Sequence, residues 1–251
     1  MAQQAPAESV TSTLQRASLV LDTFEGGRRL NLSQVVLRTG LPRSSVHRML
    51  ERLVSLRWVI RQGNEYGLGL RMMELGSAAV HQDPLRQAAL PSLQWLHRTT
   101  GCIVHLGVLD STDVIYLEKI GGELATAVTS RVGGRLPAYS SAVGKALLAS
   151  HDCAILKSPE LVTVRQTGFA YEREEALRGY GCIAAPIGPP GSREAVAAVS
   201  VCAPITRVVS EDRLRFPVRA AAAQIWRAIE SSRGGVPRSP VLRGITVPAS
   251  V

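Results

Sequence analysis

The sequence lacks the marks of several protein classes. It has four cysteines in 251 residues, and none of them forms a CxxC pair or stands at a metal-ligand spacing from a histidine. No apolar run reaches the roughly 18 residues needed to cross a bilayer, and the first residues hold no apolar stretch of a signal peptide. We therefore expect no metal site and no membrane span, and reduced cysteines in a cytoplasmic protein.

Motifs for catalysis are missing as well. There is no G-x-S-x-G elbow, and His151, Asp152 and Cys153 are chain neighbours, which is poor geometry for a catalytic triad. Residues 142–149 echo a phosphate loop but lack its first glycine and the Ser or Thr after Lys145. We predict no catalytic residue and no cofactor. An enzyme that carries an accessory binding domain is therefore the weakest of the hypotheses for this chain.

Positive charge is what the chain has in excess, and it is concentrated in one stretch. The net charge is +9. Residues 26–62 contain eight arginines, one glutamate and no lysine. Arginine suits bidentate contact with phosphate or guanine better than lysine does. The composition therefore favours a polyanionic partner.

Residues 31–68 have the pattern of two short helices followed by a hairpin. The first helix is expected from Asn31 to Gly40, and the second starts near Pro42, where a missing N–H costs nothing. A Gly-Asn turn at 62–64 indicates a β-hairpin, which would form a wing. The polar face of a helix usually contacts only water. On the second helix, however, this face begins with short and basic side chains directly after a tight turn, which favours contact with DNA. The predicted DNA contacts are Arg43, Ser44, Ser45, His47, Arg48, Arg52 and Arg61.

The rest of the chain predicts an α+β protein with a second, α/β domain. Helices are expected over about 12–25, 69–82, 85–100, 138–150 and 210–232, and strands over 103–110, 113–120, 182–188 and 195–204. The expected organisation is a disordered leader at 1–9, a winged helix-turn-helix domain at 10–70, a linker helix at 71–84, an α/β domain at 85–232 and a disordered tail at 233–251.

Several long segments, in this order, resemble the IclR family of bacterial transcriptional regulators. They are ASLVLDTF (17–24), TGLPRSSVHRMLERL (39–53), LGLRMMELG (68–76), SRVGGRLPAYSSAVGKALLA (130–149), CIAAP (182–186) and AAVSVCAP (197–204). The resemblance implies a winged helix-turn-helix domain, a linker helix and a GAF-like C-terminal domain that binds a small effector. It also implies dimers or tetramers on a palindromic operator in double-stranded DNA, and an effector that is a small organic acid or an aromatic compound.

The resemblance also suggests where the effector would bind. By position in the family's motifs, the pocket would include Gly133, Gly134, Leu136, Cys182, Ser200 and Cys202. Cys202 stands where the family commonly has a serine.

One departure from the family affects the expected function. Members of the family usually have an acidic stretch between a Gly-Tyr pair and the CIAAP cysteine, and this stretch contributes a carboxylate to the pocket. In this sequence Tyr180, Gly181 and Cys182 are consecutive, so we expect both the stretch and its carboxylate to be missing. The region 151–180 also looks abbreviated. The favoured function is a sequence-specific transcriptional regulator that responds to a small effector. The alternative is a DNA-binding regulator whose effector response is altered or lost.

Overall fold

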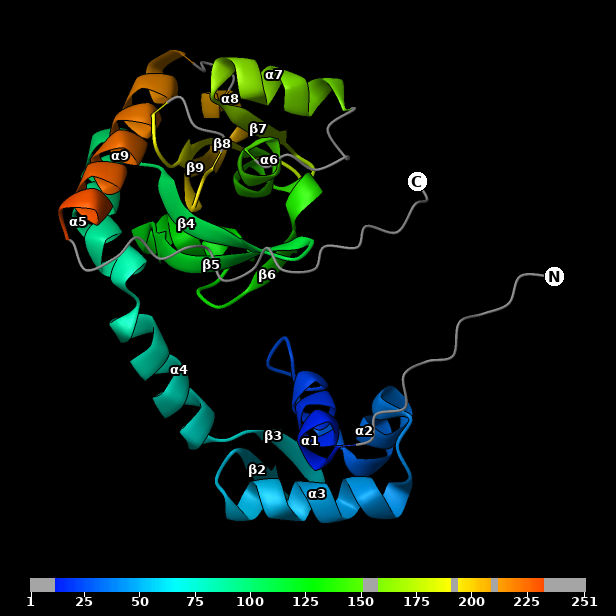
Figure 1. Ribbon diagram of the computed structural model, residues 1–251. Helices are drawn as coiled ribbons and strands as arrows, with labels where there is room; N and C mark the ends of the chain where they lie inside the picture. Colours follow the sequence, from blue (N-terminus) through cyan, green and yellow to red (C-terminus); the bar gives the residue numbers. More distant parts are fainter. Residues whose placement is uncertain (1–11, 151–157, 191–193, 209–211, 233–251) are drawn as a thin grey trace. The chain divides into compact units, whose positions relative to one another are not determined.

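The structure is a computed structural model that describes residues 12–150, 158–190, 194–208 and 212–232. The chain divides into two compact units, Met1–His81 and Gln82–Val251 (Figure 1). The expected leader and tail both lie outside the described residues. In the part of the chain that is described, no helix is both long and apolar enough to cross a membrane.

Three helices form the body of the N-terminal unit, and local capping sets their ends. The side chain of Ser12 accepts a hydrogen bond from the Gln15 N–H, and the Gln15 side chain accepts one from the Ser12 N–H. Asn31 and Gln34 make the same reciprocal pair at the second helix. Gly40 ends that helix with a φ of 66°. The helices are α1 (Thr13–Asp22), α2 (Leu32–Thr39) and α3 (Arg43–Ser55).

A small sheet completes this unit as the predicted wing. It consists of β1 (Leu30–Asn31), β2 (Val59–Gln62) and β3 (Glu65–Leu68), in the order β1-β3-β2. The two-residue β1 was not predicted. The core of the unit joins all three helices to the sheet through Val20, Phe24, Val35, Val46, Leu50 and Tyr66.

Helix α4 (Leu70–Gln82) follows the wing and has no buried residue. It stops before Asp83, whose side chain accepts a hydrogen bond from the Arg86 N–H and thereby caps α5 (Pro84–Thr100). Both helices agree with the expected break at Asp83-Pro84.

A six-stranded antiparallel sheet organises the C-terminal unit. Its strand order is β6-β5-β4-β9-β8-β7, so β4 and β9 lie at the centre. The strands are β4 (Ile103–Asp110), β5 (Asp113–Ile120), β6 (Arg135–Pro137), β7 (Ala170–Arg173), β8 (Tyr180–Ile187) and β9 (Ala197–Pro204).

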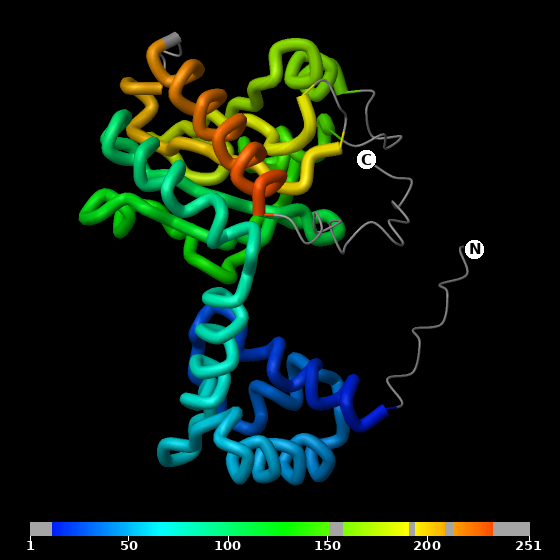
Figure 2. The backbone as a smooth tube through the Cα atoms, turned by 60° about the vertical axis from the view of Figure 1, so that its left-hand side comes forward, coloured from blue at the N-terminus to red at the C-terminus, as the bar shows by residue number. Residues whose placement is uncertain are grey.

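Helices cover the sheet, and two apolar clusters lie beneath them. Figures 1 and 2 show α5 beside α9 (Asp212–Ser231), and their apolar side chains share one cluster with the sheet. A second cluster joins the sheet to α6 (Ala142–Ala149) and α7 (Pro159–Thr167). The short helical segments are η1 (Gly122–Ala127), η2 (Ala138–Ser140) and α8 (Ile205–Val208).

The predicted strands and helices of this unit are present, but the sequence analysis did not predict β6, β7 or α7, nor the short segments η1 and α8. The two strands are only three and four residues long, so their hydrophobic alternation is too short to be recognised. The missed β7 matters most, because it supplies a residue of the site described next.

Candidate DNA-binding surface and effector pocket

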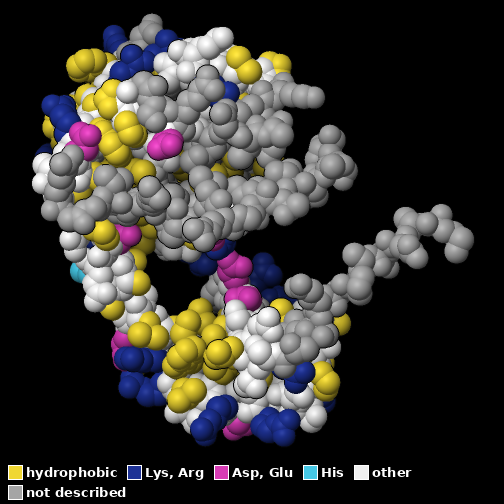
Figure 3. Space-filling view, viewed as in Figure 1, with side chains coloured by type: hydrophobic (Ala, Val, Ile, Leu, Met, Phe, Trp, Pro, Cys, Tyr) yellow, Lys and Arg dark blue, Asp and Glu magenta, His cyan; other side chains and the backbone are white. Residues whose placement is uncertain are grey.

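Helix α3 presents a polar face because its apolar stripe is turned into the core. Val46 and Leu50 are fully buried, whereas His47 and Arg48 between them are exposed. Arginine side chains gather along the edge of the N-terminal unit where α3 lies (Figure 3; compare Figure 1). The second helix of the pair therefore offers a solvent-facing basic surface that follows a tight turn.

The arginines of this surface differ in what they contact. Arg43 donates a hydrogen bond to the Ser33 hydroxyl at 3.0 Å. Arg61 on the wing donates to Glu51 at 3.3 Å and lies over the Tyr66 ring, 5.6 Å from its centroid. In the described part of the chain, the Arg48 side chain makes no hydrogen bond or ion pair. Arg48 is therefore available to a partner molecule, whereas Arg43 and Arg61 are held by their neighbours.

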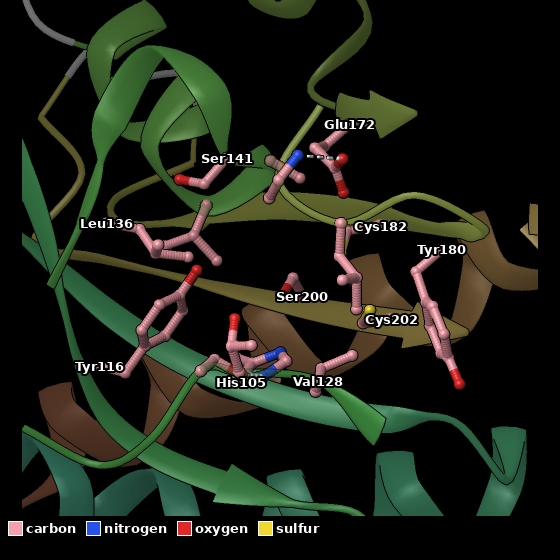
Figure 4. A pocket seen from close by; sticks show the side chains of 16 residues that line it. His105, Tyr116, Val128, Leu136, Ser141, Glu172, Tyr180, Cys182, Ser200 and Cys202 are labelled. Carbon is pink, nitrogen blue, oxygen red and sulfur yellow. Dashed lines mark hydrogen bonds between the residues drawn. The ribbon is translucent and has the colours of Figure 1, made fainter. Parts of the chain in front are cut away.

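A second candidate site is a small pocket on the α6 side of the sheet (Figure 4). Strand register places its polar residues in two rows. In the first row, Glu172 on β7 faces Cys182 on β8, which faces Cys202 on β9. In the second row, Ser200 on β9 faces His105 on β4. The remaining lining residues are Tyr116, Val128, Thr129, Ser130, Leu136, Ser141, Ala142, Val143, Ala176, Leu177 and Tyr180.

The floor of the pocket is neutral and hydrogen-bonded. Burial, reinforced by the charge of Lys119, lowers the pKa of His105 to about 3. Nε2 of the neutral His105 ring is hydrogen-bonded to the Ser130 hydroxyl at 2.8 Å. The centroids of the His105 and Tyr116 rings are 5.1 Å apart. Burial likewise raises the pKa of Tyr116, so its phenol stays protonated. The described lining residues include no lysine or arginine.

The expectation that the pocket lacks a carboxylate is wrong. Glu172 lines it and is only 2% exposed. Its Oε1 accepts hydrogen bonds from the N–H groups of Glu175 and Ala176, at 2.6 and 3.0 Å. The acidic residues lie at 172–175, upstream of the Gly-Tyr turn, and the β7–β8 hairpin brings Glu172 opposite Cys182. Examining only the residues adjacent to the cysteine therefore missed them.

Helix α6 forms the opposite wall. Ser141 caps it by accepting a hydrogen bond from the Gly144 N–H at 3.1 Å. Ala142 and Val143, in the first turn, line the pocket. The first N–H groups of a helix have no partner within it and carry the positive end of the helix dipole. The pocket thus has the first turn of α6 on one side and a carboxylate on the other.

A buried ion pair anchors the pocket wall that contains Glu172. Lys145 on α6 is 2% exposed, and its Nζ lies 2.8 Å from Glu160 on α7 and 2.7 Å from Glu175. Burial alone would lower the pKa of Lys145, but hydrogen bonds from Nζ to the two carboxylates raise it overall. The cation therefore stays charged and ties residues 172–177 to α6.

Comparison with known proteins identifies the family. The IclR helix-turn-helix domain matches residues 13–63, and the C-terminal domain of bacterial IclR transcriptional regulators matches residues 77–159 and 154–227. The chain belongs to the IclR family. It is 33% identical to the HTH-type transcriptional regulator XynR of Escherichia coli K12, over 82% of this chain and 92% of XynR.

Other members of the IclR family share the fold of this chain and are also transcriptional regulators. The chain is 29% identical to the transcriptional repressor IclR of E. coli K12, over 84% of this chain and 86% of the repressor. An IclR homologue of Microbacterium hydrocarbonoxydans, solved with 4-hydroxybenzoate, has a TM-score of 0.72 at 27% identity and covers 88% of this chain and 100% of its own. The chain is thus a DNA-binding transcriptional regulator with an effector-binding C-terminal domain, and not an enzyme.

The structure brings together most of the effector residues predicted from the IclR resemblance. Leu136, Cys182, Ser200 and Cys202 all line the pocket. Gly133 and Gly134 are not among the lining residues; they form a turn in which the Gly133 N–H donates to the Tyr116 carbonyl at 2.8 Å. The sequence analysis missed His105, Tyr116, Ser141 and Glu172, which reach the pocket only through strand pairing and helix packing. Among the described residues, no group of three or more His, Cys, Asp or Glu side chains is arranged to hold a metal ion.

Proposed function

We propose that this regulator binds a palindromic operator through α3 and the wing, as a dimer or a dimer of dimers. Arg48, Arg52, His47, Ser44 and Ser45 would lie in the major groove, with Arg43 and Arg61 nearer the phosphates. The observation that carries the proposal is the unpaired, solvent-facing Arg48 on a helix whose opposite face is fully buried. Arg48 is our candidate for a guanine contact.

Assembly would use apolar surface that a single chain leaves in water. Helix α4 has no buried residue, and Leu70, Met73 and Leu75 on it are 66%, 73% and 41% exposed. Leu70 and Met73 are three residues apart and so lie on the same face of the helix, and an exposed apolar patch of this kind typically marks an interface. Two copies meeting along α4 would place two α3 helices on one DNA duplex.

The effector we propose is a small organic acid. The N–H groups at the start of α6 suit a carboxylate, and Glu172, His105 and the hydroxyl side chains suit a hydroxyl or carbonyl group on the same molecule. The cavity volume of about 40 Å³ suits a small acid. An aromatic acid such as the 4-hydroxybenzoate of the Microbacterium homologue would require the pocket to widen. The presence of Glu172 removes the reason for supposing that effector binding has been lost.

The test combines a DNA-binding assay with a panel of effectors. Genomic fragments retained by the full-length protein define an operator, and its affinity is then measured by fluorescence anisotropy with and without small 2-hydroxy and 2-oxo acids. An effector must shift operator affinity, since it acts through its different affinities for two arrangements of the protein. Failure of every acid in the panel, together with failure of 4-hydroxybenzoate, would contradict the effector proposal while leaving DNA binding intact.

A further inference from the structure

The pocket contains a pair of thiols that effector binding as proposed above does not require. Cys182 and Cys202 are direct register partners on the adjacent antiparallel strands β8 and β9. Their side chains therefore lie on the same face of the sheet, and both line the pocket. Both are free cysteines that face each other across the strand pair. The described structure thus places two reduced sulfurs side by side in a cavity.

The usual spacing of directly opposed residues can accommodate a bridging atom. Their Cβ atoms are typically about 4.5–5.5 Å apart, at or beyond the upper end of the roughly 3.5–4.5 Å found in disulfides. One atom bound to both sulfurs adds two bonds of about 2.3 Å, the length seen at zinc thiolates, in place of one S–S bond of about 2.05 Å. The wider gap therefore suits a thiophilic atom placed between the thiols.

The protonation state of the pair points the same way. The hydrogen bond with Cys202, followed by burial and the nearby Glu172 carboxylate, raises the pKa of the Cys182 thiol. Disulfide formation starts from a thiolate, which is scarce here at neutral pH. A ligand that takes up two thiols and releases their protons does not need a pre-formed thiolate.

A site with only two sulfur ligands limits which thiol-binding elements it can hold. Zinc takes four ligands in a structural site and three in a catalytic one, and the described residues contain no group of three or more suitable side chains. Monosubstituted trivalent arsenic needs two sulfurs, and its third bond goes to carbon. Its small organic substituent would lie against the apolar part of the pocket, beside Val128 and Leu136.

We propose that Cys182 and Cys202 form a two-thiol binding site, inside the effector pocket, for a monosubstituted trivalent arsenical. With methylarsonous acid, CH₃As(OH)₂, two As–O bonds and two S–H bonds break, two As–S bonds form, and two water molecules leave. Arsenic stays trivalent, so the reaction needs no oxidant. The Glu172 carboxylate lies where it can accept the Cys182 proton as the As–S bond forms. A bound arsenical would occupy space needed by the organic effector.

The experiment uses the full-length protein and methylarsonous acid, followed by native mass spectrometry. A Cys102→Ser/Cys153→Ser variant retains only the two pocket cysteines; Cys102 belongs to the other apolar cluster of this unit, and Cys153 lies outside the described residues. This variant and the wild type should each gain one CH₃As group in place of two hydrogens. Cys182→Ser and Cys202→Ser, each made in that variant, should weaken binding on the order of 100-fold, because chelation by two tethered groups is lost.

Three results would overturn the proposal. One is equal binding by the single-cysteine variants, which would show that one thiol suffices. Another is loss of binding in the Cys102→Ser/Cys153→Ser variant. The third is recovery of tryptic peptides 179–193 and 194–207 as a stable disulfide-linked pair from protein purified in air. Circular dichroism of each variant checks folding. Because neither DNA nor organic effector is present, failure of this test is distinguishable from failure of the proposed function.

Discussion

The Lys145 ion pair predicts an unequal response to the removal of its two sides. Lys145 is almost completely buried, whereas the side chains of Glu160 and Glu175 are 51% and 41% exposed. Removing the lysine leaves two carboxylates that water can solvate. Removing both carboxylate charges leaves an ammonium group without a counterion in the interior.

The magnitudes follow from this asymmetry. We expect Lys145→Met to lower the free energy of unfolding by about 1–2 kcal/mol, because exposed carboxylates contribute little once screened. The Glu160→Gln/Glu175→Gln variant should cost about 3–5 kcal/mol, the usual loss when a buried charge loses its partner. Glu160→Gln alone, which leaves Glu175 in place, should cost less than the double variant.

The assay is urea unfolding of the full-length protein followed by tryptophan fluorescence. In a Trp58→Phe background, Trp95 and Trp226 report only on the C-terminal unit. A two-state fit gives the free energy, and equal m-values across variants show that the same unfolding is compared. If Lys145→Met proved as destabilising as the double variant, or more so, the cation would not be the costly member of the pair and the reasoning would fail.

Three further predictions follow. Arg48→Ala should weaken operator binding by about 1–3 kcal/mol and binding to random duplex much less, whereas Arg61→Ala should weaken both alike; an equal loss on both DNAs would reduce Arg48 to a phosphate contact. Glu172→Gln should weaken effector binding in calorimetry with operator affinity unchanged, and unaltered heats would exclude Glu172 from recognition. Burial lowers the pKa of His105 in the folded protein to about 3. The contribution of the neutral ring to the free energy of unfolding is therefore complete above about pH 6.5 and is lost as the pH falls toward 3, with a loss of about 2 kcal/mol at pH 5. His105→Gln should remove this part of the pH dependence.

The parts of the fold predicted from sequence are those fixed by local interactions. Ser12 with Gln15, and Asn31 with Gln34, define helix starts within four residues of chain. The buried stripe of α3 repeats at helical spacing, so its exposed face could also be inferred. These signals are complete within short windows of sequence.

The pocket was harder to predict because distant segments build it. His105 and Ser200 are 95 residues apart and meet only through the pairing of β4 and β9. Glu172 reaches Cys182 through a short strand with too few residues to show alternation. Of the site, the sequence therefore indicated residues that the family motifs point to, such as Leu136 and Cys202. It missed those that only strand pairing and helix packing bring to the pocket, such as His105, Tyr116 and Glu172.

The most direct test of the account is the affinity of the full-length protein for its own genomic operator and for a scrambled duplex over a series of salt concentrations. We expect operator affinity to exceed that for the scrambled duplex by at least about 10³. We also expect both affinities to fall steeply as salt releases the counterions that bound arginines displace. Equal affinity for the two duplexes, or binding indifferent to salt, would contradict the claim that the basic face of α3 reads DNA.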